Sequence, residues 1–179
     1  VDAEGICLIN TITKDFLLRP MGIFQLIDYI GIDVCQRILK VMRQELKDET
    51  LHEVWIDQML LHGKKGGQTA DGKQMPGFFE YDGLIPKAVY SFQEKNYIPI
   101  DEIMKRVHEN IGEAPNISWK ILQNDPKKNE RVENYLSQMQ EGTSLGSEMA
   151  RKFLHHSKEI IDKLLQDKVA RTREDINLV

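Results

Sequence analysis

The fold of this chain is decided by one stretch, Arg19-Pro20-Met21-Gly22-Ile23-Phe24-Gln25-Leu26-Ile27-Asp28-Tyr29-Ile30-Gly31-Ile32-Asp33. Pro20 disfavours the helical backbone conformation at Arg19, so the stretch opens with a corner. A short and mostly apolar segment follows over residues 23–30 and ends at Gly31. Its length and composition indicate a buried helix, with a buried strand as the alternative. Asp33 can then cap a third helix by accepting the free N–H groups of its first turn.

Helical periodicity dominates the chain on both sides of this stretch. Apolar residues at three- and four-residue steps predict helices over residues 4–18, 35–46, 51–61, 100–111 and 132–139, and a long helix that Ser147 could open. Thr172-Arg173-Glu174-Asp175 predicts a helix start, with Asp in place of the usual Glu or Gln of a capping box. Residues 77–81 predict one short extended segment, and residues 84–99 an irregular connection between two prolines. The predicted fold class is therefore all-α, a helical bundle with one extended element.

Composition narrows the possible functions. The 24 Lys and Arg against 28 Asp and Glu give a formal net charge of −4, which argues against a nucleic-acid binder. The chain is 41% hydrophobic, enough to bury a core, yet no apolar run approaches the roughly 18–20 residues that span a bilayer. Only Cys7 and Cys35 are present, so a disulfide scaffold is excluded and a cytoplasmic location is expected. Both ends lack the usual start and stop signals, so we expect a piece of a longer protein.

The sequence motifs for catalysis and metal binding are incomplete. The Gly- and Lys-rich segment 67–74 is one residue short of a phosphate-binding P-loop, because Gln74 stands where Ser or Thr should bind magnesium. His52-Glu53 begins like a zinc-protease helix but lacks the second histidine. No Gly-x-Gly-x-x-Gly fingerprint of a dinucleotide-binding domain occurs. We therefore expect no catalytic, cofactor-binding or metal-binding residue in this chain.

The opening stretch resembles the signature Pro-Met-Gly-Pro-Phe-x-Leu-x-Asp-x-x-Gly-x-Asp of the C-terminal domain of 3-hydroxyacyl-CoA dehydrogenases, a fold similar to the C-terminal domain of 6-phosphogluconate dehydrogenase. A second family marker, Gly-x-Lys-x-Gly-x-Gly-Phe-Tyr-x-Tyr, is similar to the stretch from Gly63 to Tyr81, which about ten extra residues interrupt. Ile23 replaces the second proline and Phe79 the first tyrosine. Residues 147–179 resemble the opening of a second copy of the domain.

The resemblance implies three segments. Residues 1–83 would form a first copy of the domain without its first helix, residues 84–146 a connecting helical region, and residues 147–179 the start of a second copy. It implies an NAD-dependent enzyme of fatty-acid β-oxidation or 3-hydroxybutyryl-CoA metabolism. The NAD and the catalytic His–Glu pair would belong to an absent N-terminal Rossmann domain, so this fragment would itself be inert.

The role that the resemblance leaves for this chain is to close the cleft over an acyl-CoA substrate and to supply a contact between two copies, as a homodimer or a tandem pseudo-dimer. Pro20, Met21, Gly22 and Phe24 are then expected to bind the acyl part of the substrate. Two alternatives stay open. The chain could be a free-standing helical protein-interaction module, or it could bind phosphate or nucleotide through the Gly63–Gln74 loop.

Overall fold

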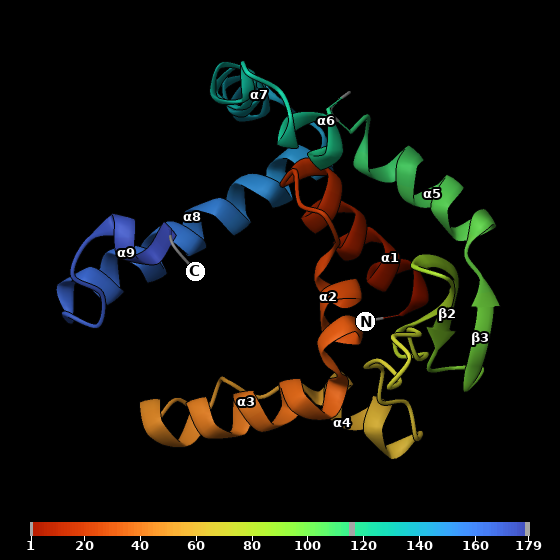
Figure 1. Cartoon of the computed structure of the whole chain (residues 1–179). Helices are drawn as coiled ribbons and strands as arrows, with labels where there is room; N and C mark the ends of the chain where they lie inside the picture. Colours follow the sequence, from red (N-terminus) through yellow and green to blue (C-terminus); the bar gives the residue numbers. More distant parts are fainter. Residues whose placement is uncertain (1, 115–116, 178–179) are drawn as a thin grey trace.

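The computed structural model of the protein describes residues 2–114 and 117–177. Its elements are mostly helical, which confirms the predicted helical class, and they include one three-stranded antiparallel sheet (Figure 1). The order along the chain is α1 Ala3–Thr11, the π-helix η1 Ile12–Phe16, α2 Ile23–Ile30, α3 Ile32–Leu46, α4 Val54–Leu61, β1 Phe79–Asp82, β2 Ile85–Ser91, β3 Asn96–Pro99, α5 Asp101–Ile111, α6 Trp119–Gln123, α7 Lys128–Glu141, α8 Leu145–Gln166 and α9 Arg173–Asn177.

The helix predicted over residues 4–18 is confirmed, but it changes from an α-helix to a π-helix at Ile12. Asp2 caps α1 by accepting a hydrogen bond from Gly5 N at 2.8 Å. The hydroxyl of Thr11 donates to Cys7 O at 2.8 Å, and that of Thr13 donates to Ile9 O at 2.8 Å. Such bonds to the carbonyl four residues back compete with the helix ladder and bend it, which is consistent with α1 widening into η1 at Ile12.

The segment after the corner is a helix, which settles the alternative between helix and strand. α2 ends at Gly31, whose φ of 109° favours glycine, and α3 begins at once. The prediction that Asp33 caps α3 is wrong, because Gly31 occupies the N-cap position and Asp33 lies in the first turn. Ile32 is fully buried and its N–H donates to Lys65 O at 2.7 Å, which starts the helix earlier than the polar residue suggests.

The sheet is where the sequence prediction was wrong. The extended segment near residues 77–81 is present as β1, but residues 84–99 form β2 and β3 rather than an irregular connection. Pro86 pairs with Tyr81 beside a register shift, and Pro99 ends the edge strand β3. Bulges and edge strands are the places where a sheet tolerates proline. The two prolines indicated an irregular connection, although both lie at such tolerated positions.

The C-terminal helices close the other side of the core. Ser144, and not the predicted Ser147, caps α8 by accepting from Ser147 N at 3.2 Å. A side chain at Gly146 would overlap the Phe16 ring, so glycine brings α8 directly against η1. The predicted start of α9 is confirmed as a reciprocal capping box: Thr172 Oγ1 accepts from Asp175 N at 3.2 Å, and Asp175 Oδ2 accepts from Thr172 N at 3.0 Å.

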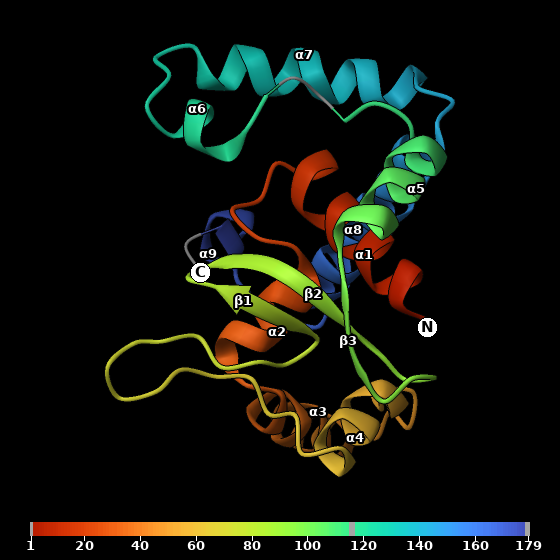
Figure 2. The same ribbon diagram turned by 90° about the vertical axis from the view of Figure 1, so that its right-hand side faces the viewer.

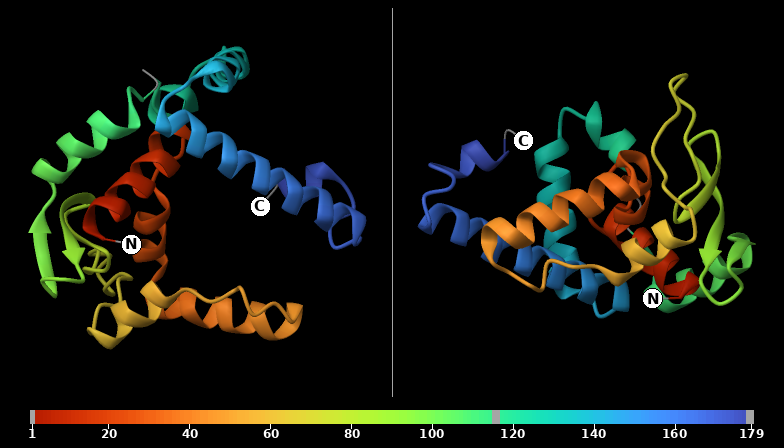
Figure 3. Two further views of the ribbon diagram at one scale, coloured as in Figure 1. Left: turned by 180° about the vertical axis from the view of Figure 1, so that it is seen from behind. Right: turned by 90° about the horizontal axis from the view of Figure 1, so that it is seen from below.

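The core lies between these layers. The sheet packs on α1 and α2, with α3 and α4 at one end and α6 and α7 at the other (Figure 2). Both α3 and α8 leave the body on the same side, as the views in Figures 1 and 3 show. None of the helices in the described part of the chain is both long and apolar enough to cross a membrane. The fully buried side chains come from α1, α2, α3, α4, the sheet and the loop just before it, α5, α6 and α8.

Candidate functional site

The two signature stretches meet at the carboxyl group of Asp28. This side chain lies in α2 and is fully buried. Its Oδ1 accepts a hydrogen bond from Phe78 N at 2.7 Å, and its Oδ2 accepts from Phe79 N at 2.9 Å and from the Tyr81 hydroxyl at 2.8 Å. Gln74 Nε2 donates to the backbone oxygen of Asp28 at 3.0 Å. The stretch around residues 74–81 is therefore tied to α2 through one residue.

Two glycines of the second stretch permit this close approach. A side chain at Gly77 would overlap the Asp28 carboxyl group. A Cβ at Gly66, whose φ is 60°, would lie 2.7 Å from the Asp28 carbonyl oxygen. Both positions thus need glycine because the loop backbone runs directly against α2.

Burial and hydrogen bonding act on Asp28 in opposite directions. Removal from water raises the pKa of the carboxyl group to about 7, although the hydrogen bonds from Phe79, Phe78 and Tyr81 lower it. Near neutral pH both protonation states are therefore populated. The carboxyl group in turn contributes to raising the pKa of Tyr81, after burial of that side chain.

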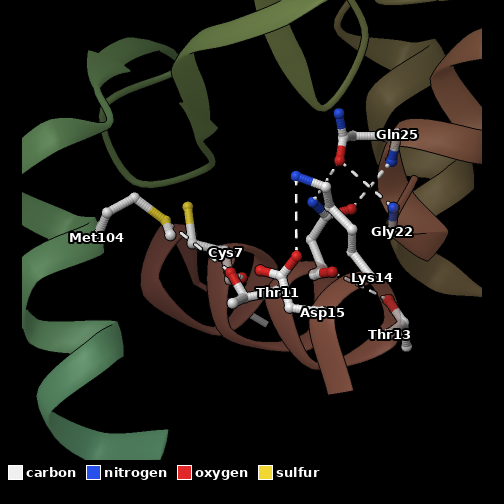
Figure 4. A network of polar contacts seen from close by, with 9 residues as sticks. Cys7, Thr11, Thr13, Lys14, Asp15, Gly22, Gln25 and Met104 are labelled. Atoms are coloured by element: carbon white, nitrogen blue, oxygen red, sulfur yellow. Dashed lines mark hydrogen bonds and ion pairs between the residues drawn. The ribbon is translucent and has the colours of Figure 1, made fainter. Parts of the chain in front are cut away.

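The corner before α2 is held by polar side chains of the preceding helix (Figure 4). Asn10 Oδ1 accepts from Gln25 N at 3.1 Å, and Thr13 Oγ1 accepts from Ile23 N at 2.9 Å. Asn10 Nδ2 also donates to Gln25 Oε1 at 3.0 Å. The free N–H groups of the first turn of α2 are therefore capped by a different helix. Gly22 is needed here because a side chain would overlap Asn10.

A cavity of about 500 Å³ opens beside this corner. Pro20, Met21 and Gln25 line it from the corner, and Tyr29 and Tyr81 from the Asp28 region. Further apolar wall comes from the β1–β2 turn, the start of β2 and the segment that leads into α6: Leu84, Ile85, Pro86, Ile117 and Trp119. A volume of this size within an apolar wall is typical of a small-molecule site.

Cations gather among the residues that line the cavity. Lys14, Arg19 and Lys120 contribute to the wall together with one carboxylate, Asp15. Lys14 Nζ lies 3.9 Å from Asp15 Oδ1, and the Arg19 guanidinium lies 4.8 Å from the centre of the Phe153 ring. An apolar cavity beside an excess of positive charge is suited to a ligand with an apolar part and an anionic part.

The four residues expected to bind substrate divide into two pairs. Pro20 and Met21 line the cavity. Gly22 packs against Asn10, and Phe24 packs on Phe78 with ring centroids 4.7 Å apart. The first pair is thus placed to touch a ligand, whereas the second pair fixes the corner and joins it to the loop before β1.

A smaller cavity of about 190 Å³ shares Lys14, Asp15, Gln25 and Pro86 with the first. Cys7 and Met104 line it as well. Figure 4 shows both side chains near Thr11. Burial raises the pKa of the Cys7 thiol to about 12, so the thiol stays protonated and is a poor nucleophile. The Cys7 thiol therefore gives this cavity no reactive nucleophile, and the cavity could only accommodate part of a ligand.

The Gly- and Lys-rich loop does not have the surroundings of a P-loop. A P-loop lies between a strand and the N-terminus of a helix. Here the loop leaves α4, closes on itself through a bridge between Gln68 and Gln74, and leads into β1. Within residues 2–114 and 117–177, no three His, Cys, Asp or Glu side chains lie close enough together to hold a metal ion.

Sequence reasoning missed the residues that organise the site. Asp28 was part of the quoted signature but was given no role, and Asn10, Gln74 and Tyr81 were not singled out as partners. A carboxylate inside an otherwise apolar run was the available signal, since a charged residue is almost never fully buried unless it is paired. The cross-helix capping by Asn10 carried no such signal.

Comparison with known proteins finds one family model that matches the part of the chain containing the corner and Asp28. The family model for the 3-hydroxyacyl-CoA dehydrogenase C-terminal domain matches residues 6–74. The match confirms the resemblance and covers the corner, Asp28 and most of the loop that closes on it. No curated protein and no solved structure matches the chain.

Proposed function

We propose that this chain is the helical domain that covers the acyl-CoA substrate in an NAD-dependent 3-hydroxyacyl-CoA dehydrogenase. The observation that carries the proposal is that the residues matched to that domain family, 6–74, also supply the corner side of the 500 Å³ cavity. Pro20 and Met21 hold the acyl part, and the apolar wall excludes water from it.

The chemical step lies outside this chain. The residues present do not fit a dinucleotide, because the Gly-rich loop leads into a bridge and a strand instead of a helix N-terminus that would bind a pyrophosphate. The contribution of this chain is to bind and orient the substrate, which alone can supply a large part of a rate enhancement. With NAD and 3-hydroxybutyryl-CoA, the isolated chain should produce no NADH, and measurable turnover would contradict this assignment.

The cavity gives a direct test of acyl-CoA binding. Trp119 lines it, whereas Trp55 packs on Phe92 at a distance of 5.1 Å between ring centroids. A Trp55→Phe background therefore makes Trp119 the single indole reporter. We expect saturable changes in its fluorescence with acetoacetyl-CoA and with a longer acyl-CoA, and weaker changes with free CoA.

A matched pair of variants separates the cavity from the surface. Met21→Glu places a carboxylate in the apolar wall and should weaken acyl-CoA binding at least about tenfold, a loss of roughly 1.4 kcal/mol. Met75→Glu makes the same change at a side chain that is 37% exposed and does not line the cavity. Equal affinity in the two variants, or a flat titration of the background protein, would refute the proposal.

The proposal extends to the ends of the chain. The division into residues 1–83, 84–146 and 147–179 makes α8 and α9 the first elements of a second domain copy. The long helix and the short helix that starts at a capping box agree with that division. An extended chain that includes residues beyond 179 should then fold a second body of the same topology, which its structure would reveal.

A further inference from the structure

A second apolar cavity, of about 320 Å³, lies between η1 and the helices that follow the sheet. Its wall includes Phe16 from η1, Leu122 from α6, Val132 from α7 and Leu154 from α8. In Figure 2, α6 and α7 lie above α1, which η1 continues. These three later helices lie outside residues 6–74, so most of this wall comes from the part of the chain that the family model does not match.

The polar groups at this second cavity already have other contacts. The Tyr135 hydroxyl donates a hydrogen bond to Phe16 O at 2.7 Å. Lys128 is exposed to solvent, and its Nζ lies 5.7 Å from the centre of the Trp119 ring. Polar ligands are oriented by a few convergent polar groups, whereas a hydrocarbon needs none. The wall therefore favours a hydrocarbon as the occupant.

The size of the second cavity agrees with that occupant. An apolar cavity of roughly 150 Å³ stays dry and takes up benzene, because water finds too few polar partners in it. The cavity between η1 and α7 has about twice that volume. It can therefore accommodate a longer hydrocarbon segment than a benzene ring.

The two cavities are continuous with each other at Leu18 and Trp119, because both side chains line both cavities. Leu18 follows η1 with a φ of 51°, a left-handed backbone conformation that a Cβ disfavours and glycine adopts easily. Its side chain is nevertheless 9% exposed and belongs to the core. A leucine at a position suited to glycine indicates a use for its side chain, which here is the shared wall.

We propose that the second cavity binds the far end of a long acyl chain, which passes Leu18 and Trp119 from the first cavity. This inference rests on the proposed function, because the nearer carbons of the acyl group must occupy the first cavity. A short acyl group ends there and does not reach α7. Each further methylene that moves from water into an apolar site tightens binding about fourfold. The chain should therefore prefer long acyl groups to short ones.

Calorimetric titration of the full chain with acetoacetyl-CoA and with dodecanoyl-CoA tests this preference. The unmodified chain should bind dodecanoyl-CoA at least about tenfold more tightly, because the longer chain buries several more methylenes. Val132→Phe places a larger side chain in the second cavity from α7. It should weaken the binding of dodecanoyl-CoA at least about tenfold and leave the Kd of acetoacetyl-CoA within about twofold.

Two further substitutions on α7 control for effects on folding. Leu136→Trp also fills the second cavity, but at a side chain that is 36% exposed, so it disturbs the core less and should have the same effect as Val132→Phe. Ser137→Phe adds a ring at an exposed residue that does not line the cavity, and it should change neither affinity. Circular dichroism should report unchanged helix content for all three variants.

The results separate this inference from the proposed function. If neither acyl-CoA binds, the proposed function fails and the inference fails with it. If both bind with equal affinity, the chain holds an acyl group but the second cavity takes no part, and only the inference is overturned. The same conclusion follows if Val132→Phe and Leu136→Trp leave the binding of dodecanoyl-CoA unchanged or weaken both ligands equally.

Discussion

The helices α2 and α3, which meet at Gly31, differ in the kinds of side chain that they bury and expose. α2 fully buries one carboxyl group, that of Asp28, although Leu26 and Ile30 of the same helix are exposed. α3 exposes a series of apolar side chains on one side: Val34, Ile38, Val41, Met42 and Leu46. The carboxyl group is tolerated because it accepts three hydrogen bonds from the segment before and within β1. The exposed side chains of α3 have no comparable partners within the described residues.

The comparison shows that side-chain type predicts burial only together with the available partners. A buried charge is strongly destabilising when its partners are removed, even where the intact arrangement contributes little net stability. An exposed aliphatic residue costs little by itself. Substitutions around Asp28 should therefore have large effects on folding, and substitutions on the open side of α3 should have small ones.

The largest effect is expected for Gly77→Ala. The new methyl group would overlap the Asp28 carboxyl group and push it away from Phe78 N and Phe79 N. Breaking a buried charged network of this kind costs about 4 kcal/mol. Urea unfolding measures the change in the free energy of unfolding.

The matched control is Gly72→Ala in the same loop, where a Cβ would meet no atom within 4 Å. The φ of 80° at Gly72 adds strain of about 1–2 kcal/mol to that variant. If the two variants lose equal stability, the contact between Gly77 and Asp28 is not what requires glycine.

The second prediction concerns pH. Asp28 has a pKa of about 7 in the folded chain against 3.8 for the ordinary group, so between these values the folded chain keeps a proton that the unfolded chain has lost. The free energy of unfolding should therefore fall as the pH rises from about 4 to about 7, by at most about 4 kcal/mol. Below that window the carboxyl group is protonated in both states and imposes no penalty.

Subtraction isolates this group from the other carboxylates. Asp28→Asn is neutral at every pH, so the difference in unfolding free energy between the unmodified chain and this variant should change across the window and stay constant outside it. A difference that is constant from pH 4 to pH 8 would contradict the raised pKa. It would show that the hydrogen bonds from Phe78, Phe79 and Tyr81 lower the pKa of Asp28 at least as much as burial raises it.

The third prediction uses the buried side of α3. Ile32 is fully buried at the start of this helix, and Ile32→Ala should cost about 3 kcal/mol through lost burial and a residual cavity. Thermal unfolding of a dilute sample measures it. A loss below about 1 kcal/mol would mean that the site can collapse around the smaller side chain.

The sequence predicted the helices well because apolar periodicity is a local property. α1, α5 and α8 have apolar stripes at helical spacing, and the start of α9 follows from Thr172 and Asp175 alone. The errors occurred where a distant contact decides the local structure. Ile32 starts α3 through a bond to Lys65 O, and Pro86 is accommodated by a register shift that depends on the partner strand.

The candidate site was predicted only in part for the same reason. Pro20 and Met21 could be proposed because the corner is visible in the sequence, and both line the cavity. Trp119 and Leu84 come from segments far along the chain, and no spacing in the sequence places them against the corner. The partners of Asp28 lie 50, 51 and 53 residues away, beyond the reach of periodicity.

The smallest effect, and the sharpest contrast with Ile32, is expected for Val41→Ala on the open side of the same helix. Val41 is 57% exposed, so its substitution removes little burial from the single chain. Alanine also has a higher helix propensity than valine, because a β-branched side chain loses rotamer freedom in a helix. We expect no change in the free energy of unfolding or a gain of up to about 0.5 kcal/mol. Thermal unfolding measures the change, and a loss above about 1 kcal/mol would mean that Val41 packs within the chain in solution.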